Sequence, residues 1–487
     1  MYAYIWTASI DNLTAKTIKV EVAGYNGLPG IKITGLPDTV VKESFYRIST
    51  AFRSCKIELP LKRFVINFIP ADVPKKGAGF DLPIAAAILK AIGVIPQEAF
   101  SNDLLYGELS LTGELKFVTG ALPIINHAKD TFDKIILPSL NSEEAGFFKD
   151  KTITIRDLHE LIKLAKGELK DLESITPQLQ EGTKVYRDFS DVIGQPLAVR
   201  AAKIAVLGKH HLLLIGSPGC GKSMIGERIP GIMPPMTEEE KLEVNSIYSI
   251  AGLLGGKTPS IGSRPFRSPH HTISDSALIG GHRVGEITLA HKGILFLDEL
   301  SEFKHNVLNA LREPLEKGSI HIARANYHHN MPADFLLVAA SNPCDCGNLL
   351  KKDGSCKCPT MSLQRFNRRL NGPLMDRFDI KVVMSPPKVR YAELCQATSL
   401  NSELIKTQVL DALAYSKDLK LKGIKQKLNE EAKKVLDRFI SSSTSSIRQV
   451  RKIIGLSRTI AIMEHKDTIT EAEILESINY SNAFTRS

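Results

Sequence analysis

The sequence predicts an α/β protein built from three parts. Between residues 191 and 385, strand-like apolar runs alternate with helical segments, which is typical of a parallel sheet flanked by helices. From residue 386 to 487, helical periodicity dominates and strand signals are absent, so we expect a small helical domain. Residues 1–168 mix strand-like and helical runs, which predicts a separate α+β domain. The length of 487 residues agrees with this division, because a domain usually holds ~100–200 residues.

The composition is that of a folded globular chain, with 43% hydrophobic and 24% charged residues, and it excludes a largely disordered protein. No apolar run reaches the ~18 residues that a membrane-spanning helix needs. The best candidate, residues 82–95, is interrupted by Lys90. The N-terminus has no basic segment before an apolar core, so no signal peptide is expected. We therefore expect a cytoplasmic protein without a membrane partner.

The net charge of +10 is unevenly distributed. Residues 1–168 hold 20 Lys and Arg against 19 Asp and Glu, whereas residues 169–487 hold 43 against 34. A basic excess in the C-terminal two-thirds permits a polyanionic partner such as nucleic acid. The charge alone is equally consistent with a basic surface that keeps the protein soluble and binds no partner.

In the first domain, the expected strands are residues 17–22, 64–69 and 134–138, and the expected helices are 82–92 and 123–130. Residues 169–190 are polar and rich in Glu, Gln and Lys, so we interpret them as a linker.

The second domain opens with a helix at 199–207 and a buried strand at 211–215, and a glycine-rich segment follows. This segment matches G-x-x-x-x-G-K-[ST] at every position, with Gly216, Ser217, Pro218, Gly219, Cys220, Gly221, Lys222 and Ser223. Such a loop between a strand and a helix turns its N–H groups toward phosphate oxygens, and the helix N-terminus adds a positive dipole. We expect Lys222 to reach the β- and γ-phosphates of ATP and Ser223 to bind Mg²⁺.

Three further segments supply polar groups for the same site. The apolar run 293–297 ends in Asp298 and Glu299, which predicts a Mg²⁺ ligand and a residue that activates the attacking water. A strand at 335–340 precedes Asn342, which could hold that water in line. Arg377 could neutralise transition-state charge from a neighbouring subunit, although such an arginine is more often a surface salt-bridge residue. Arg448 opens a basic helix and could touch the nucleotide from the helical domain.

Four of the seven cysteines lie within residues 344–358. Cys344 and Cys346 form one C-x-C pair, and Cys356 and Cys358 form a second pair nine residues later. In a cytosolic chain, four thiolates at such a spacing favour a structural Zn²⁺ site over disulfides. Free thiols are the alternative.

Residues 317–329 predict a β-hairpin before the strand at 335–340. It begins at Lys317 and carries Arg324 near its tip, so both cations are candidates for contact with a DNA backbone. A solvated hairpin without a partner explains the same charges equally well.

With these motifs in place, the chain resembles the ComM/YifB family of magnesium-chelatase-like AAA+ ATPases over nearly its whole length. Further family-like segments are residues 27–30, 35–38, 79–84, 265–271, 285–287 and 311–316. The resemblance implies a P-loop NTPase core with a helical lid, and a hexameric ring with ATP between subunits. It assigns Asn342 as the γ-phosphate sensor, Arg377 as the finger in trans and Arg448 as the second sensor. It also implies branch migration of DNA in recombination and natural transformation.

The N-terminal domain is similar to the catalytic domain of Lon proteases, which use a Ser–Lys dyad. The segment 74–79, where the nucleophile would lie, contains no Ser, and the segment 120–127 contains no Lys. Because this mechanism needs both a hydroxyl and a neighbouring amine, we predict no proteolysis. The expected function is an ATP-driven DNA motor, and the alternative is a chelatase-type or protein-remodelling ATPase that does not translocate DNA.

Overall fold

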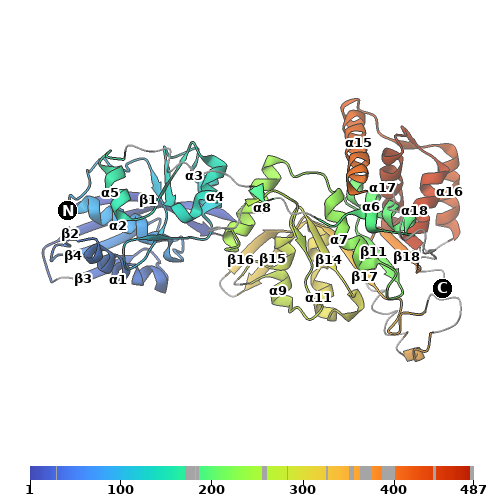
Figure 1. Cartoon of the computed structure of the whole chain (residues 1–487), viewed down its shortest axis with the longest axis horizontal. Helices are drawn as coiled ribbons and strands as arrows, with labels where there is room; N and C mark the ends of the chain where they lie inside the picture. The colour runs from blue at the N-terminus through green and yellow to red at the C-terminus, as the bar shows by residue number, and fades with distance from the viewer. Residues whose placement is uncertain are drawn as a thin grey trace. The chain divides into compact units, whose positions relative to one another are not determined.

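The computed structural model covers the chain and divides into two compact units. It describes all residues except 12, 29, 170–180, 183–185, 255–259, 282, 325–326, 350–355, 362, 364–373, 387–400, 443–445 and 483–487. The first unit comprises Met1–Thr183 and Glu238–Gly262, and the second comprises Lys184–Thr237 and Ser263–Ser487. Each unit has its own sheet and its own apolar core (Figure 1).

The first unit is built on a seven-stranded mixed sheet in the order β3-β4-β2-β1-β5-β8-β9. Its strands are β1 (Tyr2–Asp11), β2 (Thr14–Tyr25), β3 (Gly30–Thr34), β4 (Arg63–Ile69), β5 (Leu104–Leu105), β8 (Ile135–Pro138) and β9 (Thr152–Ile155). The β1–β2 and β2–β4 pairs are antiparallel, and the remaining pairs are parallel. The short strands β6 (Glu108–Leu109) and β7 (Leu115–Lys116) form a separate pair.

Helices pack against this sheet and complete the predicted α+β domain. They are α1 (Thr39–Ser54), α2 (Asp81–Ala91), α3 (Ala121–Ala128), α4 (Ser142–Ala145) and α5 (Leu158–Ala165). Every residue of α2 is buried, which explains why this segment reads as a continuous apolar run. Burial along β2 alternates, as expected for a strand with one covered face. The strands and helices predicted for this domain are confirmed, with boundaries shifted by at most three residues.

One segment assigned from sequence to the ATPase core packs instead with the N-terminal residues. It holds α8 (Glu238–Ile250) and β12 (Ser260–Ile261), which pairs with β10 (Glu181–Gly182). Ser249 of α8 donates to the buried carboxylate of Glu144, and the N–H of Gly120 donates to the Ser249 carbonyl over 3.1 Å. These partners lie more than 100 residues away in the sequence, so local patterns could not reveal them. Most of the predicted linker, 170–180 and 183–185, lies outside the described residues.

The second unit contains a five-stranded, fully parallel sheet in the order β13-β14-β17-β11-β18. The strands are β11 (Leu212–Gly216), β13 (Phe266–Arg267), β14 (Ile294–Leu297), β17 (Leu336–Ser341) and β18 (Ile380–Met384). Its helices are α6 (Pro196–Gly208), α7 (Lys222–Ile232), α9 (Asp275–Ile279), α10 (Glu286–Leu289), α11 (His305–Ala310) and α12 (Arg312–Lys317). The expected parallel sheet is therefore confirmed. The expected hairpin is also present, with β15 (Ser319–Arg324) antiparallel to β16 (Tyr327–Pro332).

The C-terminal part is helical, as expected, and is drawn in orange to red in Figure 1. It contains α15 (Ser402–Leu421), α16 (Glu430–Ser442), α17 (Ile447–Met463) and α18 (Glu471–Asn482). Leu456 and Ile460 of α17 belong to the same apolar cluster as the sheet strands, so these helices share the core of the second unit. A pair of two-residue strands, β19 (Lys427–Leu428) and β20 (Thr468–Ile469), departs from the all-helical expectation because such short strands leave no sequence signal. Across the described part of the chain, none of the helices has the length and apolar character that crossing a membrane requires.

Candidate active site and metal centre

The parallel sheet of the second unit brings three sequence motifs to one edge. The phosphate loop follows β11, Asp298 follows β14, and Asn342 follows β17. The strand β17 lies between the other two and pairs with both. Because parallel strands end on the same side, this edge is where an α/β protein binds a ligand.

The phosphate loop has the backbone that its glycines allow. Gly219 and Gly221 have φ angles of +79° and +90°, in the left-handed region that side chains disfavour. The chain then enters α7 at Lys222. The N–H groups of the first helical turn have no partner within the helix and can bind phosphate oxygens.

The Lys222 ammonium is buried beneath this loop and uses all three of its donors. It donates to the carbonyl oxygens of Gly216 and Ser217, over 2.8 and 3.0 Å, and to the Oδ1 atom of Asn342 over 3.0 Å. A phosphate oxygen must therefore replace one of these acceptors when it binds. The structure thus joins the predicted phosphate-binding lysine directly to the predicted sensor asparagine.

Ser223 and Asp298, the two predicted Mg²⁺ ligands, lie side by side. The Ser223 hydroxyl donates to Oδ2 of Asp298 over 2.6 Å, and the N–H of Glu299 donates to the other carboxylate oxygen over 2.9 Å. Hydroxyl and carboxylate oxygens are the donor set that Mg²⁺ accepts in phosphate-binding sites. The pair therefore fits a Mg²⁺ ion next to the phosphate loop.

Glu299 has a left-handed backbone, with φ of +53°, and its side chain is directed toward His271. Its Oε2 atom lies 3.4 Å from Nδ1 of His271, whose ring stacks on His270 with centroids 4.0 Å apart. From the sequence, adjacent histidines such as His270 and His271 predict only surface or hydrogen-bonding roles. The only sequence signal for this contact was the family-like segment 265–271 in which they lie.

Arg377 and Arg448 are brought together on one carboxylate. Both guanidinium groups contact Oε1 of Glu316, and the Arg448 contact is 3.1 Å long. These contacts hold the pKa of Glu316 below its usual value, and the hydrogen bond from Arg448 is the largest cause. Arg377 is 8% exposed within its own chain. A role as a finger for a neighbouring subunit therefore requires this side chain to leave Glu316.

The helix that carries Arg448 is docked on the sheet by a second polar cluster. Lys452 of α17 lies 2.8 Å from the Asp379 carboxylate, and His210 lies 3.4 Å from it. Burial alone would raise the pKa of Asp379, but these contacts hold it below its usual value. From its place on a basic helix, Lys452 is expected to be solvated, and the structure pairs it instead.

A cavity of about 680 Å³ lies between residues 189–207 and the helical part of the second unit, and one of its lining residues contacts the phosphate loop. Its walls include Phe189, Val192 and Val199, together with Val409 of the helical part. Gln195 lines it and donates to the carbonyl of Cys220 over 3.1 Å, which connects the cavity to the loop. Sequence reasoning did not identify this cavity, because its walls come from segments more than 200 residues apart.

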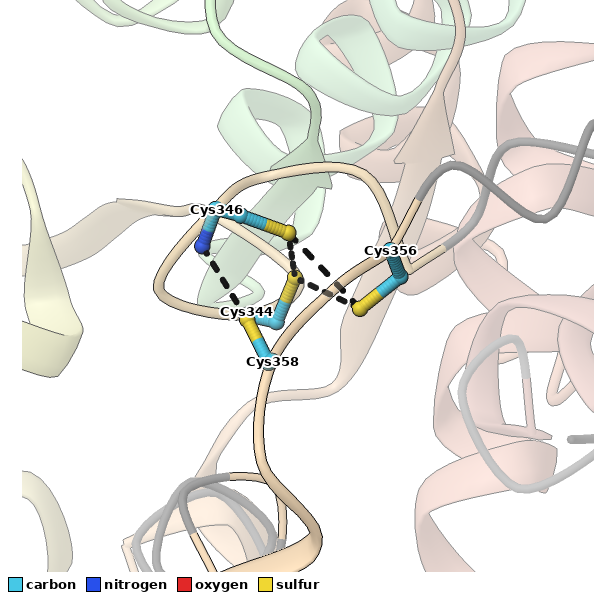
Figure 2. A group of neighbouring side chains, drawn as sticks. All are labelled: Cys344, Cys346, Cys356 and Cys358. Carbon is cyan, nitrogen blue, oxygen red and sulfur yellow. Dashed lines mark hydrogen bonds between the residues drawn. The ribbon is translucent and has the colours of Figure 1, made fainter.

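The four clustered cysteines converge, as Figure 2 shows. Their sulfur atoms all lie within 4.8 Å of one another, and the Cys344–Cys346, Cys346–Cys356 and Cys344–Cys356 separations are 3.4, 3.7 and 3.8 Å. A tetrahedral Zn²⁺ ion with ~2.3 Å bonds to sulfur would require sulfur atoms ~3.8 Å apart. The arrangement therefore fits a tetrathiolate zinc site and is too open for disulfide bonds.

The environments of these thiols differ. Burial raises the pKa of Cys344 to about 12, whereas the backbone N–H of Asn348 is the main cause that lowers the pKa of Cys346 to about 6. A thiol that ionises easily is a ready metal ligand.

Comparison with known proteins shows which family the chain resembles along most of its length. Residues 188–393 match the family model for magnesium chelatase, subunit ChlI, residues 20–141 match that for subunit ChlI of Mg-chelatase, and residues 389–481 match its C-terminal region. The YifB protein of Escherichia coli is 37% identical over 492 residues, which cover 98% of this chain and 96% of that protein. The competence protein ComM of Haemophilus influenzae is 34% identical and covers 98% of this chain and 97% of its own length. The chain belongs to the ComM/YifB family of magnesium-chelatase-like proteins.

The similarity to magnesium chelatase itself is more limited. The 67 kDa magnesium-chelatase subunit of Chlorobaculum parvum is 25% identical over 162 residues, which cover 32% of this chain and 23% of that protein. ComM/YifB membership confirms the expected P-loop NTPase core and indicates an ATPase.

The two DNA-contact candidates lie on the hairpin region of this ComM/YifB core. Lys317 ends α12, and its ammonium pairs with Glu313 one helical turn earlier, over 3.0 Å. Arg324 lies at the end of β15, paired in register with Tyr327, and its side chain is outside the described part of the structure.

Proposed function

We propose that this chain is an ATP-hydrolysing motor that assembles as a hexameric ring and moves branched or single-stranded DNA, most specifically in branch migration during recombination and natural transformation. The observation that carries the proposal is the joined set of Lys222, Asn342, Ser223, Asp298 and Glu299 at one sheet edge. Two phosphate-binding groups, two Mg²⁺ ligands and a carboxylate base are what ATP hydrolysis requires.

The residues divide the chemistry between them. The chemistry that Mg²⁺ would supply when bound is positive charge, which neutralises the negative charge that develops on the phosphates during hydrolysis. Ser223 and Asp298 would hold the ion, and Lys222 would bind the phosphate oxygens. Glu299, released from His271, would accept a proton from the attacking water. Asn342 would orient that water, and the adjacent cavity would hold the adenine base.

The DNA part of the proposal depends on charge and on relatives. The basic excess lies in residues 169–487, which contain the ATPase core and the helices that cover it. Backbone contacts to DNA need cations and little base-specific chemistry. A DNA function also agrees with the name of the Haemophilus influenzae relative, a competence protein.

The test is ATP turnover with and without DNA. We expect branched or single-stranded DNA to raise turnover severalfold at low salt and to lose this effect as salt increases, because phosphate contacts release counterions. A branched substrate should be resolved only when ATP is present, and Lys222→Ala should abolish both activities. Turnover that no DNA changes, even at low salt, would contradict the motor function.

A chelatase-type or protein-remodelling ATPase is the second candidate, because all three matching family models describe a magnesium-chelatase subunit. It predicts ATP turnover that a protein partner stimulates while DNA has no effect. The same assay therefore separates the two candidates.

We also propose a structural Zn²⁺ held by Cys344, Cys346, Cys356 and Cys358, since their sulfur atoms already have the required spacing. Metal analysis of the purified chain should give about one zinc per chain. A cytoplasmic location and the absence of proteolysis stay predictions.

A further inference from the structure

The cysteine cluster begins immediately beside the ATP site. Asn342 follows the last residue of β17, and Cys344 lies two residues further along the chain. Cys344 is 1% exposed and is the buried member of the cluster. Asn342 itself contacts the Lys222 ammonium over 3.0 Å. Only Pro343 separates Cys344 from Asn342, so a movement of Cys344 would reach Asn342 through a single residue.

The cysteine loop also packs directly on the phosphate loop. Gly347 has φ of +75°, and a Cβ atom built on it would lie 2.3 Å from Cδ of Pro218. A side chain at Gly347 would overlap the ring of Pro218, because real Cβ atoms do not approach other atoms so closely. The N–H of Gly347 donates to the Cys344 carbonyl over 2.9 Å, and this hydrogen bond closes a tight turn over residues 344–347.

The second pair of cysteines, Cys356 and Cys358, contacts this turn. The N–H of Cys346 donates to the sulfur of Cys358 over 3.4 Å, and Cys356 lies 3.7 Å from the sulfur of Cys346 (Figure 2). Among the described residues of the two pairs, the direct contacts between the pairs all involve a thiol, and such contacts are weak. A metal bound to all four sulfurs would cross-link them, so that metal binding would order the turn.

We propose that the tetrathiolate metal is a brace for ATP hydrolysis: it fixes the turn at Gly347 against Pro218 and thereby positions Asn342 and the phosphate loop. The metal touches neither nucleotide nor water, and Gly347 acts as a positioning residue. This inference rests on the proposed zinc site. It predicts that metal loss impairs the hydrolysis step more than nucleotide binding, because the loop N–H groups and Lys222, which is held against the loop carbonyls, would supply most of the phosphate contacts.

The first experiment removes the metal from the full chain. The double variant Cys356→Ser with Cys358→Ser is compared with Cys55→Ser, which changes a cysteine of the other unit. Zinc content, ATP affinity, kcat and hydrogen exchange of segments 216–223 and 342–347 are measured. We expect the double variant to lose zinc, to keep ATP affinity within about threefold, to lose at least tenfold in kcat, and to exchange faster in both segments. The Cys55→Ser variant should match the wild type in all four measurements.

The second experiment keeps the four cysteines and disturbs only the contact. Gly347→Ala places a methyl group against Pro218, whereas Gly423→Ala makes the same change at φ of +68° where no atom lies within 4 Å. We expect Gly347→Ala to retain zinc and to lose at least fivefold in kcat. We expect Gly423→Ala to remain within twofold of the wild type. This comparison separates the contact itself from the strain of a side chain in the left-handed region.

The outcomes distinguish the two levels of the proposal. Wild-type protein without stoichiometric metal would overturn both the zinc site and the brace. A wild type that contains zinc, with a folded and metal-free double variant that keeps its kcat and its exchange rates, would overturn the brace alone. If the double variant does not fold, the wild type is stripped with a chelator and reloaded with Zn²⁺. A kcat that neither falls on stripping nor returns on reloading would contradict the brace.

Discussion

At the scale of single residues, the side chains of the candidate active site all contact other groups of the same chain. The three donors of Lys222 are used by Gly216, Ser217 and Asn342, and the carboxylate of Glu299 faces His271. Two arginines share the carboxylate of Glu316. Each catalytic candidate therefore has a partner that a nucleotide, water or neighbouring subunit must replace. The contact between Glu299 and His271 is partly exposed, so giving it up costs little free energy.

Glu299→Gln tests the assignment of the base. The amide cannot accept a proton from water, so we expect ATP affinity to stay within about threefold and turnover to fall at least ~100-fold. Glu302→Gln, an acid three residues further along the same turn, is the matched control and should keep its turnover. Turnover retained by Glu299→Gln would assign the base elsewhere.

At the scale of elements, the placement of α8 depends on a buried polar cluster. The carboxylate of Glu144 is buried, which raises its pKa, and it accepts from Ser249, Asn141 and the N–H of Leu122. A buried carboxylate must be hydrogen-bonded, so this cluster specifies where α8 packs.

Ser249→Ala removes one donor from that carboxylate. We expect the first unit to lose about 1–3 kcal/mol of unfolding free energy, because a buried acceptor loses its partner. Hydrogen exchange in α8 should rise, and exchange in the strands of the second unit should not. The control Ser246→Ala changes a serine on the same helix that is not buried. Equal exchange in both variants would show that the cluster does not hold α8.

The start of β11 contributes a pH dependence. Burial lowers the pKa of His211 from 6.5 to about 4, and its Nδ1 accepts from the N–H of Leu337 over 3.2 Å. The unfolded chain binds a proton below pH 6.5 that the folded chain binds only near pH 4, so stability is complete above pH 6.5 and falls between these values.

Between pH 7 and pH 4, the second unit is expected to lose about 1–2 kcal/mol of unfolding free energy. This is less than the full effect of the pKa shift, because the His211 side chain keeps some contact with solvent. In His211→Asn, whose amide oxygen can accept the same N–H but does not titrate there, the slope of stability against pH should be shallower. Denaturant unfolding of both proteins at pH 7, 6, 5 and 4 measures this difference. Parallel curves would show that His211 does not titrate on unfolding.

At the scale of the whole molecule, the proposed ring makes each ATP site depend on two subunits. Arg377 is buried on Glu316 within its own chain, so a finger in trans requires assembly to draw it out. Arg377→Ala should lose turnover by about 10³–10⁵-fold, the range known for such fingers. Mixing it with Lys222→Ala subunits should restore part of the activity, because the second variant supplies an intact arginine to sites with an intact lysine. No recovery at any mixing ratio would count against a shared site.

The sequence predicted those parts of the fold and site that depend on neighbouring residues. The phosphate loop needs glycines, a lysine and a serine at fixed spacing after an apolar strand, and all of these lie within thirteen residues. The cysteine pairs are similarly local. By contrast, Arg267 and Glu286, from two separate family-like segments, form a double ion pair at 2.6 Å that no local pattern indicated. The pairing of Lys317 with Glu313 also reduces the case for Lys317 as a free DNA contact.

The sequence by itself determined which groups are available for chemistry: a phosphate loop, an Asp-Glu pair, an asparagine after an apolar strand and four thiols, each in a segment short enough to be recognised from its residue spacing. Only the tertiary structure decided which of these groups meet. It joined Lys222 to Asn342, Arg377 and Arg448 to Glu316, α8 to the first unit, and Gly347 to Pro218. The physical reason is that parallel-strand order and core packing set contacts between residues that are far apart in the chain, and no local pattern encodes them.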